Sequence, residues 1–264
     1  MIHRAKKSLG QNFLKSEAAL SAMCTSGSVN NKDTVVEIGP GKGALTIKLL
    51  ESASKVIAIE KDRDLIKILE EKFSKDIEPG KLELIEGDIL EFEPGNHGLV
   101  SGKYKIIANI PYNITGAIFE KFLSGGVKPD TMVLLVQKEV AQRIVASDGK
   151  ESILSLSVKV YGTPKYIMKV GKRFFSPSPK VDSAIVAING ISEKSLLNKG
   201  LEDKFFQIVK AGFAHKRKVL RKNLEEVGDP LKIESIFKEL NISTKARAED
   251  ISLPVWLSIT KYLS

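Results

Sequence analysis

The sequence predicts an α/β protein in which a doubly wound sheet is followed by a small all-helical domain. Short apolar runs alternate with helix-like segments up to about residue 147, an order typical of a parallel sheet with helices on both faces. From about residue 190 the strand-like runs stop, and amphipathic helical patterns take over. We therefore expect one domain over residues 1–190 and a second over residues 191–264.

The composition indicates a globular protein with a polyanionic partner. Lys and Arg total 41 against 32 Asp and Glu, a formal net charge of +9, which favours nucleic acid as the partner. A single cysteine, Cys24, excludes an internal disulfide, and the three histidines show no metal-ligand spacing, so we expect no metal site. We also expect a cytoplasmic protein, because no apolar run approaches the about 20 residues of a membrane span and the chain starts without a signal core.

The N-terminal segment places basic residues before a pair of amides. Gln11 and Asn12 stand next to Phe13 and Leu14, which suggests a segment that packs over a polar group. Taken alone, the basic residues are most simply a solvated tail; they are Arg4, Lys6 and Lys7. A helix is expected next, from about residue 16 to residue 26.

Residues 34–38 are expected to form the first strand, which runs into a glycine-rich turn and a helix over residues 44–51. The turn reads Gly39-Pro40-Gly41-Lys42-Gly43, and this strand–turn–helix order points backbone N–H groups at a ligand. Its spacing is one residue short of the dinucleotide fingerprint, and Gly43 stands where a P-loop needs Ser or Thr. Without a pyrophosphate to bind, the turn suits an uncharged ribose and an amino-acid moiety.

Acidic residues follow the next two strands at the same edge of the sheet. Residues 55–60 end on Glu60, which stands about 20 residues beyond the glycines, where doubly wound folds place a ribose-binding acid. Residues 82–86 lead to Asp88, positioned to accept a hydrogen bond from an adenine amine. A strand-ending acid is as often a helix cap, but the two acids and the glycine turn together predict a Rossmann-like cofactor site.

The fourth expected strand, residues 104–108, ends in the stretch Asn109-Ile110-Pro111-Tyr112-Asn113. Proline makes this turn stiff, so the Asn109 side-chain oxygen and a neighbouring carbonyl can accept both hydrogens of a flat amino group. The Tyr112 ring can stack on the base that carries this amine. From these residues alone, a strand end followed by a proline turn is the simpler interpretation. Convergence of the turn with the two acids on one sheet edge favours a binding site, because parallel sheets bind ligands there.

The rest of the expected sheet domain is a fifth strand over residues 131–136, a helix from residue 137 to about 147, and a hairpin over residues 165–170 and 184–188. The hairpin loop contains Arg173-Phe174-Phe175-Ser176-Pro177-Ser178-Pro179-Lys180 and is stiffened by its prolines. Adjacent phenylalanines are usually core residues, but at least one of this pair is a candidate platform for a base.

Residues 204–223 contain no acid, and their apolar residues recur at helical spacing. The polar face of these helices is therefore uniformly positive. Such a face is usually only solvated, but one without balancing acids favours contact with phosphates. The basic residues expected to bind RNA here are Lys216, Arg217, Lys218, Arg221 and Lys222.

These motifs, in this order over nearly the whole chain, closely resemble the KsgA family of small-subunit (16S) ribosomal RNA adenine N6,N6-dimethyltransferases. The matching stretches are residues 10–14, 37–43, 109–113, 137–140, 179–183, 216–221 and 247–249. The resemblance implies a class I methyltransferase domain that uses S-adenosylmethionine. It also implies, as substrate, two adjacent adenosines in a hairpin loop near the 3′ end of the rRNA, each methylated twice on its exocyclic amine. The partner would be a pre-ribosomal small-subunit particle, and we expect a monomeric enzyme.

The resemblance further implies a division of roles among the residues. Asn109, Ile110, Pro111 and Tyr112 would hold the target adenine, and Phe175 would close its other face. The residues expected to hold the cofactor are Gln11, Asn12, Leu14, Gly39, Gly41, Gly43, Glu60, Asp88, Ile89 and Asn109. Outside the basic helices, the residues expected to contact RNA are Arg4, Lys6, Lys7, Arg173 and Lys180.

Two alternatives stay open at this point. The antibiotic-resistance (Erm-type) dimethyltransferases of large-subunit rRNA share the glycine turn and the Asn-Ile-Pro-Tyr turn, although residues 137–140 and 216–221 resemble the small-subunit family more. A ribosome-assembly factor in which catalysis is dispensable would keep the same fold. The intact set of a turn amide, a turn tyrosine and two strand-end acids argues against a purely structural role.

Overall fold

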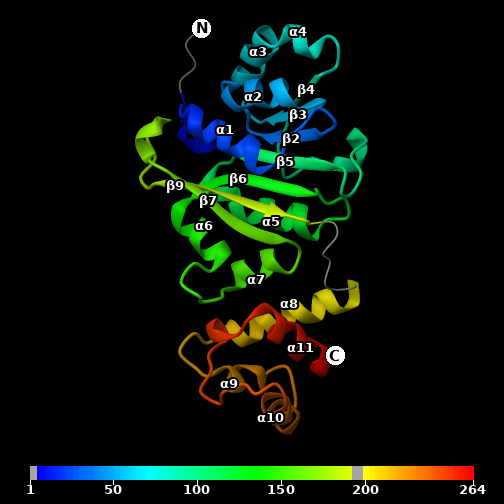
Figure 1. The fold of residues 1–264 in the computed structure, drawn as a ribbon, viewed down its shortest axis with the longest axis vertical. Helices are drawn as coiled ribbons and strands as arrows, with labels where there is room; N and C mark the ends of the chain where they lie inside the picture. Colours follow the sequence, from blue (N-terminus) through cyan, green and yellow to red (C-terminus); the bar gives the residue numbers. More distant parts are fainter. Residues whose placement is uncertain (1–4, 192–198) are drawn as a thin grey trace. The chain divides into compact units, whose positions relative to one another are not determined.

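The computed structural model describes residues 5–191 and 199–264, and contacts between residues divide the chain into two compact units (Figure 1). The first unit consists of Met1–Ala141 and Thr163–Glu193, and the second of Gln142–Gly162 and Lys194–Ser264. The expected α/β fold with a helical C-terminal part is confirmed. The helical unit also takes in residues 142–162, which a single boundary after residue 190 leaves with the sheet.

The first unit is built on a seven-stranded sheet with the order β4-β3-β2-β5-β6-β9-β7. Strands β2 to β6 run parallel, and β9 runs antiparallel to both of its neighbours, β6 and β7. The central strands are buried, which explains why they read as continuous apolar runs. The strands are β2 (Thr34–Ile38), β3 (Lys55–Glu60), β4 (Leu82–Glu86), β5 (Tyr104–Asn109), β6 (Thr131–Gln137), β7 (Thr163–Val170) and β9 (Ser183–Asn189).

Helices of the first unit share one hydrophobic core with this sheet. Met23 of α1 and Leu49 of α2 are fully buried in the same cluster as Ile107 of β5 and Val133 of β6. A short ladder pairs β1 (Phe13–Leu14) with β8 (Phe175–Ser176). The helices are α1 (Glu17–Ser26), α2 (Ala44–Ser52), α3 (Arg63–Lys72), α4 (Ser74–Ile77) and α5 (Thr115–Ser124), with 3-10 helices η1 (Lys7–Leu9), η2 (Pro94–His97), η3 (Tyr112–Ile114) and η4 (Lys172–Phe174). Helix α6 (Lys138–Val145) begins in the first unit and ends in the second.

The strand order brings the carboxyl ends of β2, β3, β4 and β5 to one edge of the sheet. The chain moves outward from β2 through β3 to β4 and then returns to β5 on the other side of β2. The register pairs Ile38 with Ile59 and Glu60 with Glu86, so the ends of the first three strands are level. The reversal at β2 is a topological switch point, the place where open α/β sheets bind ligands.

The second unit is helical and has its own core. Trp256 is fully buried and stacks on Phe213, with ring centroids 5.9 Å apart. Helices α8 and α11 approach closely at Gly212, because a Cβ there would lie 2.4 Å from the Trp256 ring. The helices are α7 (Ile153–Lys159), α8 (Lys199–Phe213), α9 (Leu220–Leu224), α10 (Pro230–Glu239) and α11 (Leu253–Leu263), with the 3-10 helix η5 (Ala248–Asp250).

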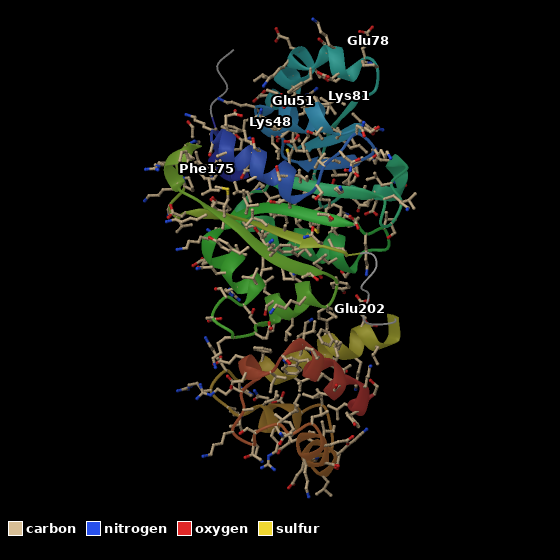
Figure 2. The ribbon with its side chains drawn as sticks, viewed as in Figure 1. Lys48, Glu51, Glu78, Lys81, Phe175 and Glu202 are labelled. Atoms are coloured by element: carbon tan, nitrogen blue, oxygen red, sulfur yellow. The ribbon has the colours of Figure 1, made fainter. Side chains whose placement is uncertain are left out.

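Several polar contacts attach residues 142–162 to the rest of the helical unit, including an ion pair of Lys150 with Asp250. The Glu151 N–H donates to the Glu249 carbonyl at 2.8 Å. The Tyr161 hydroxyl bonds to the Glu202 carboxylate, which Figure 2 labels on α8. These partners lie far apart in the sequence, so no local pattern indicated the contacts. Among the described residues, no helix has the length and apolar character needed to cross a membrane.

Candidate active site

A cavity of about 380 Å³ lies at the carboxyl ends of β2, β3, β4 and β5. The N-terminal segment, the glycine turn and the Asn-Ile-Pro-Tyr turn form its walls. Most of the residues that the sequence nominated for the cofactor and the target base therefore line one cavity. They are Gln11, Asn12, Leu14, Gly39, Gly41, Glu60, Asp88, Ile89, Asn109, Ile110, Pro111 and Tyr112. The two that do not line it are Gly43 and Phe175.

The glycine turn needs glycine at each of its three positions, but for different reasons. Gly39, Gly41 and Gly43 all have positive φ, the region that L side chains rarely adopt. A Cβ on Gly39 would meet open space, whereas one on Gly41 would lie 2.9 Å from the Phe13 ring. A Cβ on Gly43 would lie 2.5 Å from the Phe73 ring. Gly43 thus allows close packing against Phe73 and does not face the cavity, which corrects its expected role in cofactor binding.

Glu60, at the end of β3, is held by the backbone on both carboxylate oxygens. Oε2 accepts from the Gly41 N–H at 3.0 Å, and Oε1 accepts from the Asp62 N–H at 2.9 Å. Burial raises the pKa of Glu60, and these backbone hydrogen bonds oppose the rise. Each oxygen keeps a free lone pair, so the carboxylate can also accept from ligand hydroxyls.

Asp88 follows β4 and is paired with a lysine. Its Oδ2 lies 2.7 Å from Lys61 Nζ, and its Oδ1 accepts from the Leu90 N–H at 3.0 Å. The hydrogen bond from Lys61 lowers the pKa of Asp88, so the carboxylate stays ionised at neutral pH. Ile89, which is buried, adds an apolar wall beside this acceptor.

Asn109, the last residue of β5, has its amide orientation set by the N-terminal segment. The Asn109 Nδ2 donates to the Asn12 carbonyl at 3.1 Å. Because a carbonyl only accepts, the amide nitrogen must face Asn12, which leaves Oδ1 as a free acceptor. Pro111 follows with φ −58° and ψ 132°, the stiff turn that the sequence predicts.

Tyr112 begins η3 and is anchored at its hydroxyl. The Tyr112 hydroxyl lies 2.6 Å from Ser183 Oγ, and Ser183 is fully buried at the start of β9. Burial raises the pKa of Tyr112, so its ring carries a neutral hydroxyl at physiological pH. The Thr115 hydroxyl donates to the Tyr112 carbonyl at 3.1 Å and fixes the following turn. The ring is therefore anchored at its hydroxyl, and it lines the same cavity as Asn109, an arrangement suited to stacking on a flat ring.

Phe175 does not reach the cavity, contrary to the role expected for it. It is 4% exposed, pairs with Leu14 in the β1–β8 ladder and belongs to the hydrophobic core (Figure 2). Its neighbour Phe174 is 36% exposed, and the Arg173 guanidinium lies 5.0 Å from the centre of its ring. Phe174 ends η4, one residue before β8, and it is the exposed member of the pair.

The family model of the ribosomal RNA adenine dimethylases matches residues 2–264. The chain belongs to this family. It is 40% identical to the ribosomal RNA small subunit methyltransferase A of Dehalococcoides mccartyi, over 96% of this chain and 86% of that protein. It is 38% identical to the protein of the same name from Fusobacterium nucleatum, over 99% and 98% of the two chains.

Solved structures of the same class share the fold of this dimethylase. A dimethyladenosine transferase from Plasmodium falciparum superposes with a TM-score of 0.78 at 27% identity, over 94% of this chain and 95% of that one. The 23S rRNA methyltransferase ErmE superposes with a TM-score of 0.80 at 25% identity, over 96% and 99%. The chain is an S-adenosylmethionine-dependent rRNA adenine dimethyltransferase, and its curated relatives are small-subunit enzymes.

The cavity of this dimethylase fits S-adenosylmethionine in its charge as well as in its acceptors. Glu37 of β2 lines the cavity, is 1% exposed and keeps its Oε2 without a hydrogen-bond partner. Burial raises the pKa of Glu37 to about 8. Glu37 is therefore a neutral carboxyl at neutral pH, and the negative charge that suits a cofactor with an ammonium and a sulfonium comes from the ionised Asp88. The sequence analysis missed Glu37, although an acid inside the apolar run of residues 34–38 was a signal for it.

The residues nominated for RNA contact lie in both units, and several of them have partners within the protein. Lys6 is held by two carboxylates, and Arg173 lies over Phe174. In the helical unit, Arg221 lies 3.8 Å from Glu234, and Lys222 lies 3.1 Å from Glu225. The exposed basic residues for which the structure describes no ion pair are Lys7, Lys180, Lys216, Arg217 and Lys218. Arg4 lies outside the described residues.

Proposed function

We propose that this dimethylase transfers methyl groups to two adjacent adenosines in a hairpin loop near the 3′ end of small-subunit rRNA, within a pre-ribosomal small-subunit particle. The observation that carries the proposal is the Asn109 amide, whose Oδ1 is left as an acceptor in the cavity that Tyr112 also lines. An amide acceptor and an aromatic ring in one cavity are what the exocyclic amine of an unstacked adenine requires.

In this proposal the cofactor lies along the ends of the strands. The Glu60 carboxylate accepts from the ribose hydroxyls, and Asp88 accepts from the adenine amine. The glycine turn leaves room for the methionine moiety at Gly39. Gln11, Asn12, Leu14 and Ile89 complete the walls. When bound, S-adenosylmethionine supplies an electrophilic methyl group on a sulfonium.

The chain's own residues position the target amine. Asn109 Oδ1 and the Ile110 carbonyl accept its two hydrogens, which turns the nitrogen lone pair away from the ring plane. Tyr112 stacks on the base and replaces the stacking lost when the nucleotide leaves its loop. Positioning of this kind is the main source of catalysis in a direct displacement. Burial raises the pKa of Cys24 to about 11, so it is a neutral thiol and no candidate nucleophile for methylation of a ring carbon.

The RNA-binding surface in this proposal includes Lys216, Arg217 and Lys218, which are exposed on the segment after α8. Phosphate contacts of this kind position the RNA and do not read its bases. Lys7 and Lys180 supply further positive charge in the first unit. We further propose that the protein works as a monomer, in the cytoplasm, on assembling small subunits.

An Erm-type activity on large-subunit rRNA has less support. ErmE shares the fold at 25% identity, whereas the small-subunit enzymes reach 40%. An assembly factor without catalysis does not require a free amide acceptor inside an acidic cavity, and a buried carboxylate such as Glu60 costs stability.

The decisive experiment supplies the purified protein and S-adenosylmethionine to small ribosomal subunits from a strain that lacks this methylation. Mass spectrometry of nuclease digests should show N6,N6-dimethyladenosine at two adjacent positions near the 3′ end. The Asn109→Ala variant should produce almost none. Methylation of isolated large-subunit rRNA in place of small subunits would overturn the proposal.

A further inference from the structure

We propose that Lys6 and Asp62 form a latch that closes the N-terminal segment, residues 6–14, over the cofactor cavity. The inference rests on the proposed cofactor site and assigns Lys6 to it as a positioning residue. The sequence placed Lys6 among the RNA contacts instead, as one of several lysines in a basic tail. The two assignments lead to different measurable consequences.

The N-terminal segment crosses the cavity and is tied down at three points. The Gln11 Nε2 donates to Asp62 Oδ2 at 2.8 Å, while Gln11 Oε1 accepts from the Lys6 N–H at 2.8 Å. Further along, the Asn12 carbonyl accepts from Asn109. The segment ends in the β1–β8 ladder. Its residues form one wall of the cavity, so lifting the segment would open the site.

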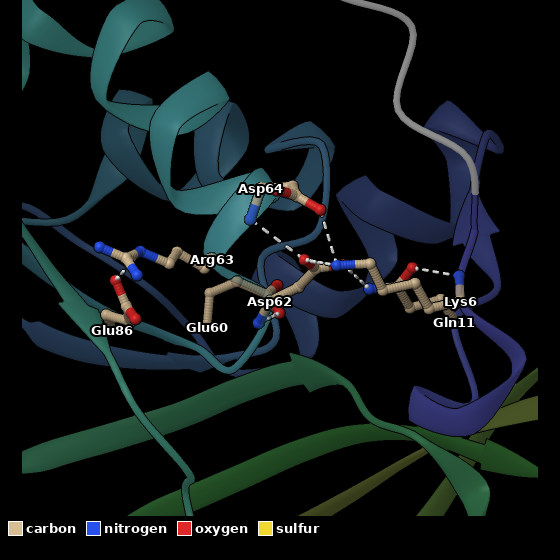
Figure 3. A network of polar contacts seen from close by, with 7 residues as sticks. All are labelled: Lys6, Gln11, Glu60, Asp62, Arg63, Asp64 and Glu86. Atoms are coloured by element: carbon tan, nitrogen blue, oxygen red, sulfur yellow. Dashed lines mark hydrogen bonds and ion pairs between the residues drawn. The ribbon is translucent and has the colours of Figure 1, made fainter.

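The Lys6 ammonium holds the N-terminal end of this segment in place through two ion pairs. Lys6 Nζ lies 2.6 Å from Asp62 Oδ1 and 2.7 Å from Asp64 Oδ2, and Figure 3 shows it between the two carboxylates. The Asp62 side chain is fully buried, whereas that of Lys6 is 43% exposed. A buried carboxylate needs a compensating charge, so Asp62 holds Lys6 more tightly than an exposed partner would.

Asp62 also links the latch to the acid that we assign to the cofactor ribose. Its N–H donates to Glu60 Oε1 at 2.9 Å, and its Oδ1 caps α3 by accepting from the Asp64 N–H at 3.1 Å. The residue that anchors the N-terminal segment is therefore the one that orients Glu60. Substitution of Asp62 would remove the cap of α3 and the acceptors of Gln11 and Lys6 together, so Lys6 is the residue to change.

The latch should act on cofactor retention. When a neutral residue replaces Lys6, the segment loses its ion pairs with Asp62 and Asp64, and it opens more often. Opening lets the cofactor leave, so its dissociation rate should rise while its association rate changes little. At saturating cofactor the bound molecule holds the segment closed, and the turnover number should stay near its original value.

The test measures S-adenosylmethionine binding by calorimetry with no RNA present. Lys6→Gln should bind about three- to fivefold more weakly, the range expected for a partly exposed ion pair. Lys6→Arg should restore the affinity. Lys67→Gln removes an equal charge from an exposed lysine on α3 that has no ion-pair partner in the described structure, and its cofactor affinity should not change. Raising the salt concentration should narrow the gap between Lys6→Gln and the parent.

Steady-state kinetics on small subunits separate the latch from an RNA contact. Lys6→Gln should raise the KM for S-adenosylmethionine and leave the affinity for RNA and its salt dependence intact. The opposite split, with cofactor affinity unchanged and RNA affinity reduced, would overturn the latch and return Lys6 to the RNA surface. If the parent protein itself failed to bind S-adenosylmethionine, the proposed function would fail, whatever Lys6 does.

Discussion

The substitution Glu37→Gln should stabilise the protein by an amount that grows with pH. Burial raises the pKa of Glu37 from the ordinary 4.5 to about 8, so at neutral pH the folded protein keeps a proton that the unfolded chain has released. The free energy of unfolding therefore falls as pH rises from about 4.5 towards 8 and is level beyond that range. The glutamine variant has no such proton and lacks this fall.

The magnitude follows from the difference between the two pKa values. At about 1.4 kcal/mol for each pH unit, a pKa of about 8 against 4.5 corresponds to at most about 5 kcal/mol between pH 4.5 and pH 8. Glu37 Oε2 has no partner, and the glutamine amide will also leave a buried polar atom unpaired. That cost is the same at every pH. The pH dependence of the difference in unfolding free energy between the two proteins therefore isolates the titration of Glu37.

The assay is urea unfolding of both proteins at pH 5, 6, 7 and 8 without cofactor. Far-ultraviolet circular dichroism is the suitable signal, because the single tryptophan, Trp256, lies in the helical unit and Glu37 in the sheet. Between pH 5 and pH 8 the free energy of unfolding of the variant should rise by several kcal/mol relative to that of the parent. Titrating groups that do not interact with Glu37 are common to both proteins and cancel, whereas the coupling of Glu37 to Glu60 and Lys72 stays within the measured difference. Parallel stability curves would show that Glu37 ionises normally and would refute the reasoning.

The remaining predictions concern the site and the RNA surface. Glu60→Ala should weaken S-adenosylmethionine binding at least tenfold in calorimetry, since each charged hydrogen bond is worth about 1.5–3 kcal/mol; unchanged affinity would remove Glu60 from the site. It should also lower the melting temperature, because the N–H groups of Gly41 and Asp62 lose their acceptor. Asn109→Ala should nearly abolish dimethyladenosine formation while RNA binding persists, and turnover at the parent rate would contradict the assigned role. A variant in which Lys216, Arg217, Lys218 and Arg221 are all neutralised should flatten the log–log salt dependence of RNA binding by up to about three units, at about 0.7–0.9 per contact. The methylated positions should not change. An unchanged slope would mean that these four basic side chains only cover the helices.

The position of the cavity could be predicted from the sequence because parallel sheets leave little choice. Each local motif follows an apolar run of strand length, and successive parallel strands must end at the same edge. The glycine turn, Glu60, Asp88 and Asn109 therefore had to come together once the runs were identified as parallel strands. The fold class and the family followed from the same short-range patterns.

Burial and charge pairing were decided by residues distant in the sequence. The partners of Lys6 lie more than fifty residues away, so the sequence could present Lys6 only as one more basic side chain. Phe174 and Phe175 are chemically alike, and the pairing of Phe175 with Leu14 determines which of them is buried. In the sequence Gly43 cannot be distinguished from Gly39 and Gly41. Only the fold shows that Gly43 packs closely against Phe73.

The sequence by itself determined where the strands end and which chemical groups stand at those ends, since both are properties of neighbouring residues. Only the tertiary structure decided the state of those groups. Glu37 keeps its proton because the folded sheet removes water from it, and the Asn109 amide faces one way because the Asn12 carbonyl stands opposite. Desolvation and hydrogen-bond partners arise from the packing of segments that the chain brings together only when it folds.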